Sequence, residues 1–239
     1  MPLCAKGDTM HCGEYDYRAE CGIRLAKKPV PPARRGHVLV EVKAAGVNPV
    51  DAKFVAGDKF PERCMPFWKW KFTGKTAGFD WSGKVVTAPE GSGFKTGDEC
   101  FGTNFQYFPQ SVLAMKYTGT FSSFASVPID QCCLKPTTLS FVEAASLPLV
   151  GITCLQAFDQ RGVKEGQRVL VVGASGGVGH VAVQLLSRMG VQVTGVCSTP
   201  NVDFVKSCGA VDVVDYRAGD AIEQLQVLVA EKGMFDVSR

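Results

Sequence analysis

The first 132 residues carry short runs in which apolar and polar positions alternate, and Gly or Pro interrupts each run. Alternation with a period of two is typical of strands that bury one face. The clearest runs are HVLVEVKAAGV (37–47), WSGKVV (81–86), DECFGT (98–103) and SSFASVP (122–128). Residues 1–132 are therefore expected to form a small β-barrel or sandwich domain.

The pattern changes in residues 133–239, where strand-like apolar runs alternate with amphipathic helical stretches. Ser140 followed three residues later by Glu143 is a capping-box pattern, so a helix is expected to begin there. The runs RVLVVGA, VQVTGVC and AVDVVDY are expected to be strands, with helices at 177–189 and 202–207 between them. A further helix around 220–232 and the start of a strand at FDV follow. This order predicts an α/β domain with a doubly wound parallel sheet.

Composition and charge narrow the function. The net charge of +3 is too small and too evenly spread to favour nucleic acid as the main partner. Apolar runs stay well below the roughly 18 residues that a membrane span needs, and the N-terminus lacks the apolar core of a secretory leader. The ten cysteines form no CxxC pair, so we expect reduced cysteines and no metal site. A cytoplasmic location is expected.

A glycine-rich turn, which we call the glycine turn, follows the first strand of the α/β domain. Gly173, Gly176, Gly177 and Gly179 stand where the strand RVLVV turns into the helix expected at 177–189. Glycines at this point let a pyrophosphate approach the backbone, and the helix N-terminus directs N–H groups toward it. The alternative is a tight strand-to-helix turn without a ligand. The strand before the glycine turn and the helix after it favour a dinucleotide-binding site.

The end of the next strand indicates which dinucleotide is bound. NAD-binding folds usually carry an acidic residue there, but this strand ends in Cys197, Ser198 and Thr199. Hydroxyl donors tolerate a 2′-phosphate that a carboxylate would repel, so the cofactor is expected to be NADPH. In the alternative interpretation, Ser198 and Thr199 cap the next helix, and both roles are compatible.

At this level of detail the chain resembles a known family. Six motifs carry the resemblance in order: AAGVNPVDAK (44–53), GFDWSG (78–83), GDECFG (97–102), AASLPLVGITCLQAF (144–158), GASGGVG (173–179) and KSCGAVDVVDY (206–216). They are similar to the zinc-free quinone oxidoreductase, or zeta-crystallin-like, branch of the medium-chain dehydrogenase/reductase superfamily. The resemblance implies a GroES-like β-barrel domain (1–132) and an NADP-binding Rossmann domain (133–239). It also implies hydride transfer from NADPH to quinones or α,β-unsaturated carbonyls, as in enoyl reductases.

The same resemblance assigns site residues. Asn48 and Asp51 are expected near the nicotinamide and the substrate, and Thr153 is expected to face the nicotinamide. Asn48 and Phe79 replace zinc ligands of related enzymes, so no metal is expected. The remaining cofactor-binding residues are expected to hold the pyrophosphate (Gly173, Ser175, Gly176, Gly177, Val178, Gly179), the 2′-phosphate (Ser198, Thr199) and the adenosine (Tyr216).

Each assignment has a structural alternative. Asn48-Pro49 is also a turn signal, the Thr153 hydroxyl also suits a bond to the preceding helical turn, and Tyr216 also suits a strand end that covers the sheet. Relatives often carry Lys where this chain has Pro200, which weakens the case for NADPH.

The length of the second domain raises a further alternative. A full Rossmann sheet has six strands, and this sequence supplies three and the start of a fourth. We therefore expect a C-terminally truncated member of the family that is unstable or forms a homo-oligomer. Two functions follow from the sequence: an NADPH-dependent reductase of small quinones or enones, or a catalytically weak fragment that binds nucleotide or a partner.

Overall fold

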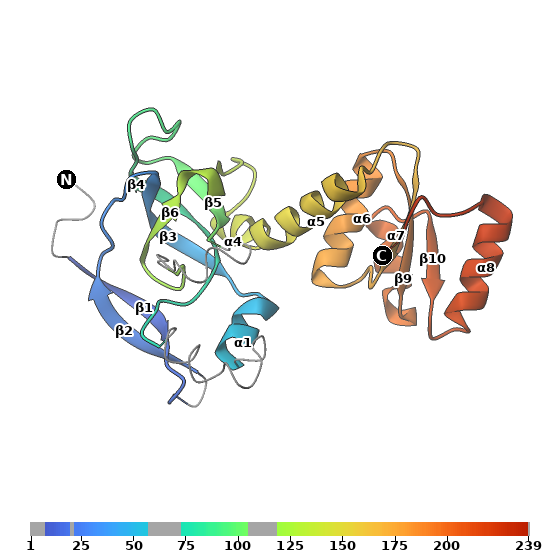
Figure 1. The fold of residues 1–239 in the computed structure, drawn as a ribbon, viewed down its shortest axis with the longest axis horizontal. Coiled ribbons are helices and arrows are strands. Elements are labelled where there is room, and N and C mark those ends of the chain that lie inside the picture. Colours follow the sequence, from blue (N-terminus) through green and yellow to red (C-terminus); the bar gives the residue numbers. More distant parts are fainter. Residues whose placement is uncertain (1–7, 20–21, 57–72, 105–118, 239) are drawn as a thin grey trace. The chain divides into compact units, whose positions relative to one another are not determined.

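A computed structural model describes residues 8–19, 22–56, 73–104 and 119–238 (Figure 1). The chain forms two compact units, residues 1–149 and 150–239. The domain boundary expected at residue 132 falls inside the first unit, because the strand that begins there completes the sheet of that unit.

The first unit is built on a five-stranded antiparallel sheet with the order β6-β3-β4-β5-β7. Its strands are β3 (His37–Gly46), β4 (Asp80–Thr87), β5 (Glu99–Thr103), β6 (Phe124–Pro128) and β7 (Cys132–Leu134). The side chains of Val38, Val40, Trp81 and Val85 are fully buried between these strands. The four strand-like runs of the sequence are thus confirmed as strands of one sheet.

A short helix leads out of this sheet. A 3₁₀ turn, η2 (Ile129–Gln131), precedes β7, and α4 (Phe141–Ala145) follows it. The Ser140 hydroxyl accepts the backbone N–H of Glu143, and the Glu143 carboxylate accepts that of Ser140, so the predicted capping box is confirmed. The longer helix α5 (Pro148–Arg161) begins in the first unit and continues into the second.

A two-stranded hairpin and a further helix were not foreseen from the sequence. Strands β1 (Thr9–Tyr15) and β2 (Ile23–Pro29) pair antiparallel, and α1 (Pro49–Ala56) follows β3. Glu14 of β1 is buried and binds Arg24 at 2.6 Å and Lys28 at 2.7 Å, both on β2. This ion pairing compensates for the burial of a carboxylate inside the hairpin.

The second unit is built on a parallel sheet with the order β10-β9-β8-β11. Its strands are β8 (Arg168–Val172), β9 (Gln192–Cys197), β10 (Asp212–Asp215) and β11 (Val237–Ser238). Between them lie α6 (Gly177–Arg188), the 3₁₀ turn η3 (Thr199–Asn201), α7 (Val202–Ser207) and α8 (Ala221–Lys232). The α/β fold class and the predicted order of strands and helices are confirmed.

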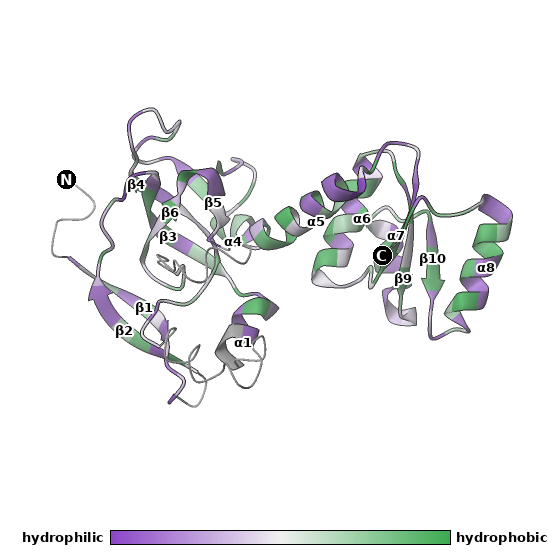
Figure 2. Ribbon diagram, viewed as in Figure 1, coloured by the Kyte–Doolittle hydropathy of each residue, from purple (hydrophilic) through white to green (hydrophobic). Residues whose placement is uncertain are grey.

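The two faces of this sheet differ in how fully its helices are buried. Val183 and Leu186 of α6 pack with Val193 of β9 in the core of the unit. By contrast α8 has no buried residue, and Figure 2 shows hydrophobic and hydrophilic residues alternating along it. The glycine turn lies at the carboxyl end of β8. Open parallel sheets bind their ligands at the carboxyl ends of their strands.

Candidate functional site

Asn48 and Asp51 together begin helix α1. Pro49 is the first helical residue, a position that suits its fixed φ and its missing N–H. The Asp51 carboxylate, through Oδ2, accepts the backbone N–H of Asn48 at 2.7 Å, and the Asp51 N–H donates to the Asn48 carbonyl oxygen at 2.9 Å. Asn48-Pro49 therefore opens a helix, and two of the residues that the sequence assigned to the site are in direct contact.

The Asn48 side chain reaches a third residue, Asp80, which is the first residue of β4. Asn48 Nδ2 donates to Asp80 Oδ2 at 2.9 Å, and the backbone N–H of Leu149 donates to the same oxygen at 3.1 Å. The Thr120 hydroxyl donates to the Asp80 carbonyl oxygen at 3.1 Å, which holds the backbone of Asp80 in place. Asp80 was not foreseen as a site residue, although it stands directly after Phe79 in the motif that replaces zinc ligands.

The two carboxyl groups are buried, with exposed fractions of 3% for Asp51 and 0% for Asp80. Burial raises the pKa of Asp51 to about 6; the hydrogen bond from Asn48 lowers it, and the charge of Asp80 raises it. Burial also raises the pKa of Asp80, against hydrogen bonds from Asn48, Thr103 and Leu149. Among the described residues, the Oδ1 atom of each group is buried and no hydrogen-bond partner is found for it. The pair therefore holds a proton more tightly than exposed carboxyl groups do.

The chemistry of this cluster does not fit a zinc ion. Zinc prefers Cys and His ligands, and an amide and a phenyl ring occupy the positions of Asn48 and Phe79. Within the described residues, no group of three His, Cys, Asp or Glu side chains could hold a metal. The described cysteines are free thiols, and burial raises the pKa of Cys100 to about 12.

The glycine turn connects β8 to α6 in the second unit. Gly173 has a φ of +73°, a conformation that favours glycine, and its carbonyl oxygen accepts the N–H of Gly176 at 2.9 Å. A Cβ on Gly179 would collide with the carbonyl oxygen of Gly173, whereas a Cβ on Gly177 would have no heavy atom of the described residues within 4 Å. Gly179 thus serves the packing of helix on strand, and Gly177 faces open space.

The N-terminus of α6 fits a phosphate group. Its N-cap residue is Gly176, and no side chain caps the first turn of the helix. The N–H groups of that first turn, which begins at Gly177 and Val178, are the ones that lack a partner within a helix. Together with the space beside Gly177 they form a site suited to an anion. Ser175 lies in the same turn and is partly buried.

The predicted 2′-phosphate residues lie between two strand ends. Ser198 is buried, and its hydroxyl oxygen accepts Asn201 Nδ2 at 3.0 Å, which leaves the hydroxyl proton available to a ligand. The Thr199 hydroxyl instead bonds to the carboxylate of Asp215, and this bond lowers the pKa of Asp215. Asp215 was not foreseen, because it ends β10 rather than β9. Tyr216 follows it and is exposed.

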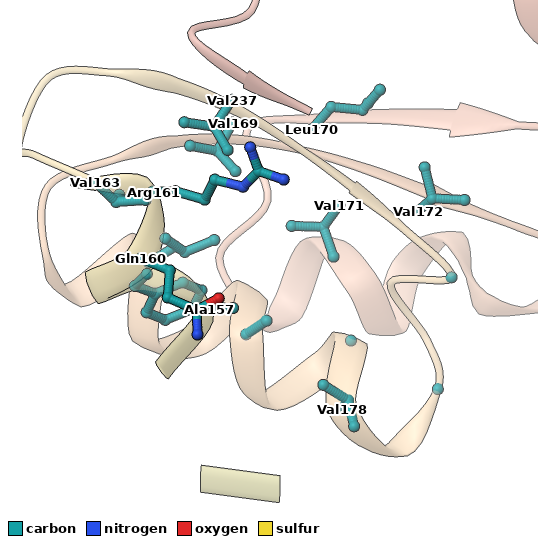
Figure 3. A pocket seen from close by; sticks show the side chains of 16 residues that line it. Ala157, Gln160, Arg161, Val163, Val169, Leu170, Val171, Val172, Val178 and Val237 are labelled. Carbon is teal, nitrogen blue, oxygen red and sulfur yellow. The ribbon is translucent and has the colours of Figure 1, made fainter. Parts of the chain in front are cut away.

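An apolar cavity of about 430 Å³ extends from the glycine turn along β8 (Figure 3). Val169 and Val171 of β8 and Val178 of α6 line it, with Arg161 and Gln160 of α5 as its polar members. Thr153 lies on α5 in the second unit, is exposed, and is not among the lining residues. The structure thus brings Asn48 and Asp51 into contact in the first unit, and it places the glycines and Ser198 in the second.

Comparison with known proteins gives one family for the first unit and relatives for the whole chain. Residues 34–137 match the alcohol dehydrogenase GroES-like domain family. The chain is 36% identical over 216 residues to a human mitochondrial protein named NAD(P)H oxidoreductase RTN4IP1, covering 80% of this chain and 49% of that protein. It is 36% identical over 218 residues to the Aspergillus terreus trans-enoyl reductase pgmF, covering 87% of this chain and 58% of that protein. This chain therefore spans about half the length of these relatives.

The fold has a counterpart among solved structures. The quinone oxidoreductase of Coxiella burnetii superposes with a TM-score of 0.74 at 29% identity, covering 91% of this chain and 65% of that one. The likeness extends over both units of the present chain, and the solved chain is again the longer of the two.

Proposed function

We propose that the chain belongs to the zinc-free quinone oxidoreductase branch of the medium-chain dehydrogenase/reductase superfamily, and that it is an NADPH-dependent, zinc-independent oxidoreductase of quinones or α,β-unsaturated carbonyls. The observation that carries the proposal is the uncapped N-terminus of α6 beside the open space at Gly177. That combination suits the pyrophosphate of a dinucleotide.

The reduced nicotinamide of bound NADPH would supply a hydride, which is the two-electron reductant that such substrates need. A quinone takes up the hydride and one proton and becomes a hydroquinone, while an enone takes them up across its carbon–carbon double bond. We assign the pyrophosphate to the turn from Gly173 to Gly179 and the 2′-phosphate to Ser198, with Thr199 as its neighbour and Tyr216 against the adenosine. We place Thr153 and Asn48 toward the nicotinamide and the substrate.

Asp51 contributes to the proton balance of the site. Its pKa of about 6 lies closer to neutral pH than that of an exposed carboxyl group, so it exchanges a proton under conditions in which the substrate consumes one. Asp51 is buried, and no partner for its Oδ1 is found among the described residues, so a change in its protonation alters a site with little exposure to solvent.

The test is a fluorescence titration of the 239-residue chain with NADPH and with NADH, followed by an assay for reduction of a small quinone. We expect tighter binding of NADPH and loss of NADPH absorbance when the quinone is added. Equal or tighter binding of NADH would remove the argument from Ser198.

A second candidate function is the binding of a nucleotide or a partner without turnover. The residues of the proposed nucleotide site, from Gly173 to Ser198, all lie in one unit, whereas Asn48 and Asp51 lie in the other. NADPH binding with no quinone or enone reduction would select this function over the first.

Location and assembly are part of the proposal. No helix in the described part of the chain is long and apolar enough to cross a membrane. We propose a cytoplasmic protein that acts on a small molecule and forms a homo-oligomer. Fractionation and light scattering test the two statements independently of activity.

A further inference from the structure

Asn48 occupies the position that usually caps a helix, yet its side chain does not serve that purpose. An N-cap Asn normally accepts a backbone N–H of the first turn through its side-chain oxygen. Here the amide group turns to Asp80, 32 residues along the chain, and Nδ2 donates to its carboxylate. Among the described residues no donor to Asn48 Oδ1 is found. The side chain is therefore directed by a contact between distant parts of the sequence rather than by its own helix.

This contact determines which way the amide group faces. Asp80 Oδ2 also accepts the N–H of Leu149, so this oxygen acts as an acceptor toward both neighbours. An amide rotated by half a turn would set Asn48 Oδ1 against an oxygen that accepts, and two acceptors repel. Nδ2 must face Asp80, and Oδ1 must face away from it. Asn48 thus offers a hydrogen-bond acceptor to any ligand on the side away from Asp80.

The same carboxylate oxygen supports the start of α5. Pro148 is the first residue of that helix and has no N–H, so Leu149 carries the first backbone donor. A carboxylate that accepts this donor satisfies one of the free N–H groups of the helix and interacts favourably with its dipole. Thr153 lies one turn further along α5.

Asp80 itself is held firmly. It is fully buried, its strand pairs with β3 and β5, and Thr120 donates to its carbonyl oxygen. A buried side chain with a fixed backbone sets the positions of the groups that it binds, because close packing leaves it little freedom to follow them.

We propose that Asp80 is a positioning residue that fixes the orientation of the Asn48 amide and the start of α5 through its Oδ2 atom. The proposal rests on the proposed function for its catalytic meaning, since Asn48 is the residue that we place toward the substrate. Its structural part, the hydrogen bond from Asn48, is tested without any activity.

The test uses protein labelled with ¹⁵N on asparagine. The chain has three asparagines, Asn48, Asn104 and Asn201, so three side-chain amide pairs are expected in the spectrum. We expect one Asn48 proton to be shifted downfield and protected from exchange with water in the unaltered chain. In Asp80→Ala it should lose both properties, while the buried Asn104, also in the first unit, keeps its signals and shows that this unit is folded.

Asp80→Asn is the conservative variant, because its amide oxygen can accept both N–H groups without a charge. We expect it to retain the shifted, protected Asn48 signal, and this variant keeps the proposal testable if Asp80→Ala does not fold. Asp130→Ala, at an exposed acidic residue of the first unit, is the matched control and should change neither signal nor turnover.

The kinetic readout separates positioning from simple stabilisation. Per folded molecule, Asp80→Ala should lower kcat about 10- to 100-fold with little change in KM for NADPH, as expected for a misplaced contact group. The double variant with Asn48→Ala should lose less activity than the product of the two single losses, because both changes act on the Asn48 amide. An unchanged Asn48 signal in Asp80→Ala, or additive losses in the double variant, would overturn the proposal. If no chain reduces a quinone, the proposed function fails while the spectrum still decides the role of Asp80.

Discussion

Replacing the buried carboxyl group of Asp51 by an amide should stabilise the first unit at neutral pH. The pKa of this group rises from 3.8 in a model compound to about 6 in the folded chain. Between these two values the folded state binds more protons than the unfolded state, so the free energy of unfolding falls as the pH rises. At 1.36 kcal/mol per pKa unit the full penalty above pH 6 is about 3 kcal/mol. In Asp51→Asn this penalty should disappear.

The replacement suits the local hydrogen bonds. The new amide oxygen can accept the backbone N–H of Asn48, as Asp51 Oδ2 does at 2.7 Å. The net gain at pH 7.5 should be about 2–3 kcal/mol, which corresponds to a rise in Tm of roughly 4–12 °C for a unit of this size. Turnover should fall at the same time, because we assign Asp51 a role in the site.

Tryptophan fluorescence is the appropriate assay. All three tryptophans lie before residue 150, and Trp81 is fully buried, so the signal reports unfolding of the first unit. Urea unfolding is followed from pH 4 to 8 in the unaltered chain, in Asp51→Asn and in the exposed control Asp130→Asn. We expect the stability of Asp51→Asn to fall less with pH than that of the other two proteins. Parallel curves for all three, or a less stable Asp51→Asn at pH 7.5, would show that Asp51 carries no burial penalty.

Three further predictions concern the cofactor, the metal and the glycine turn. Ser198→Asp should reverse the preference for NADPH over NADH, because a carboxylate repels a 2′-phosphate; an unchanged ratio of the two dissociation constants would rule out this role for Ser198. Elemental analysis of protein purified without chelators should find no stoichiometric zinc, and one tightly held zinc per chain would contradict the ligand argument. Gly179→Ala should lower the free energy of unfolding by about 1–3 kcal/mol, since its Cβ meets the Gly173 carbonyl oxygen, whereas Gly177→Ala should leave stability unchanged and weaken NADPH binding. Equal thermal melts for these two variants would refute the distinction.

The second unit could be predicted almost completely because its signals are local. The glycine turn, the strands on either side of it and the amphipathic α6 follow one another directly in sequence. The hairpin of the first unit could not be predicted in the same way. Strand β1 places Glu14 on its buried side, where an apolar residue would be expected, and Arg24 and Lys28 on β2 compensate for its charge. A pattern of apolar and polar residues does not contain that pairing.

The same difference between local and distant contacts applies to the residues of the candidate site. The pairing of Asn48 with Asp51 lies within one helical turn and follows from the sequence motif. Asp80 and Asp215 escaped notice because their partners are far away: Asp80 binds Asn48 and Leu149, and Asp215 binds Thr199 on a neighbouring strand end. Contacts of this kind depend on the pairing of strands, which short motifs do not specify.

The different surroundings of Gly177 and Gly179 bear on how such sequences diverge. Gly179 is needed for helix and strand to approach each other, so a gene copy that lost its catalytic task would still be selected to keep it for folding. A Cβ on Gly177 would meet no atom of the described residues, so this position can mutate once a dinucleotide no longer binds beside it. Among duplicated genes of this family that lose cofactor binding, the glycine at the position of Gly177 should therefore be substituted earlier than the glycine at the position of Gly179. A motif that keeps both glycines indicates a gene that is still under selection to bind its ligand.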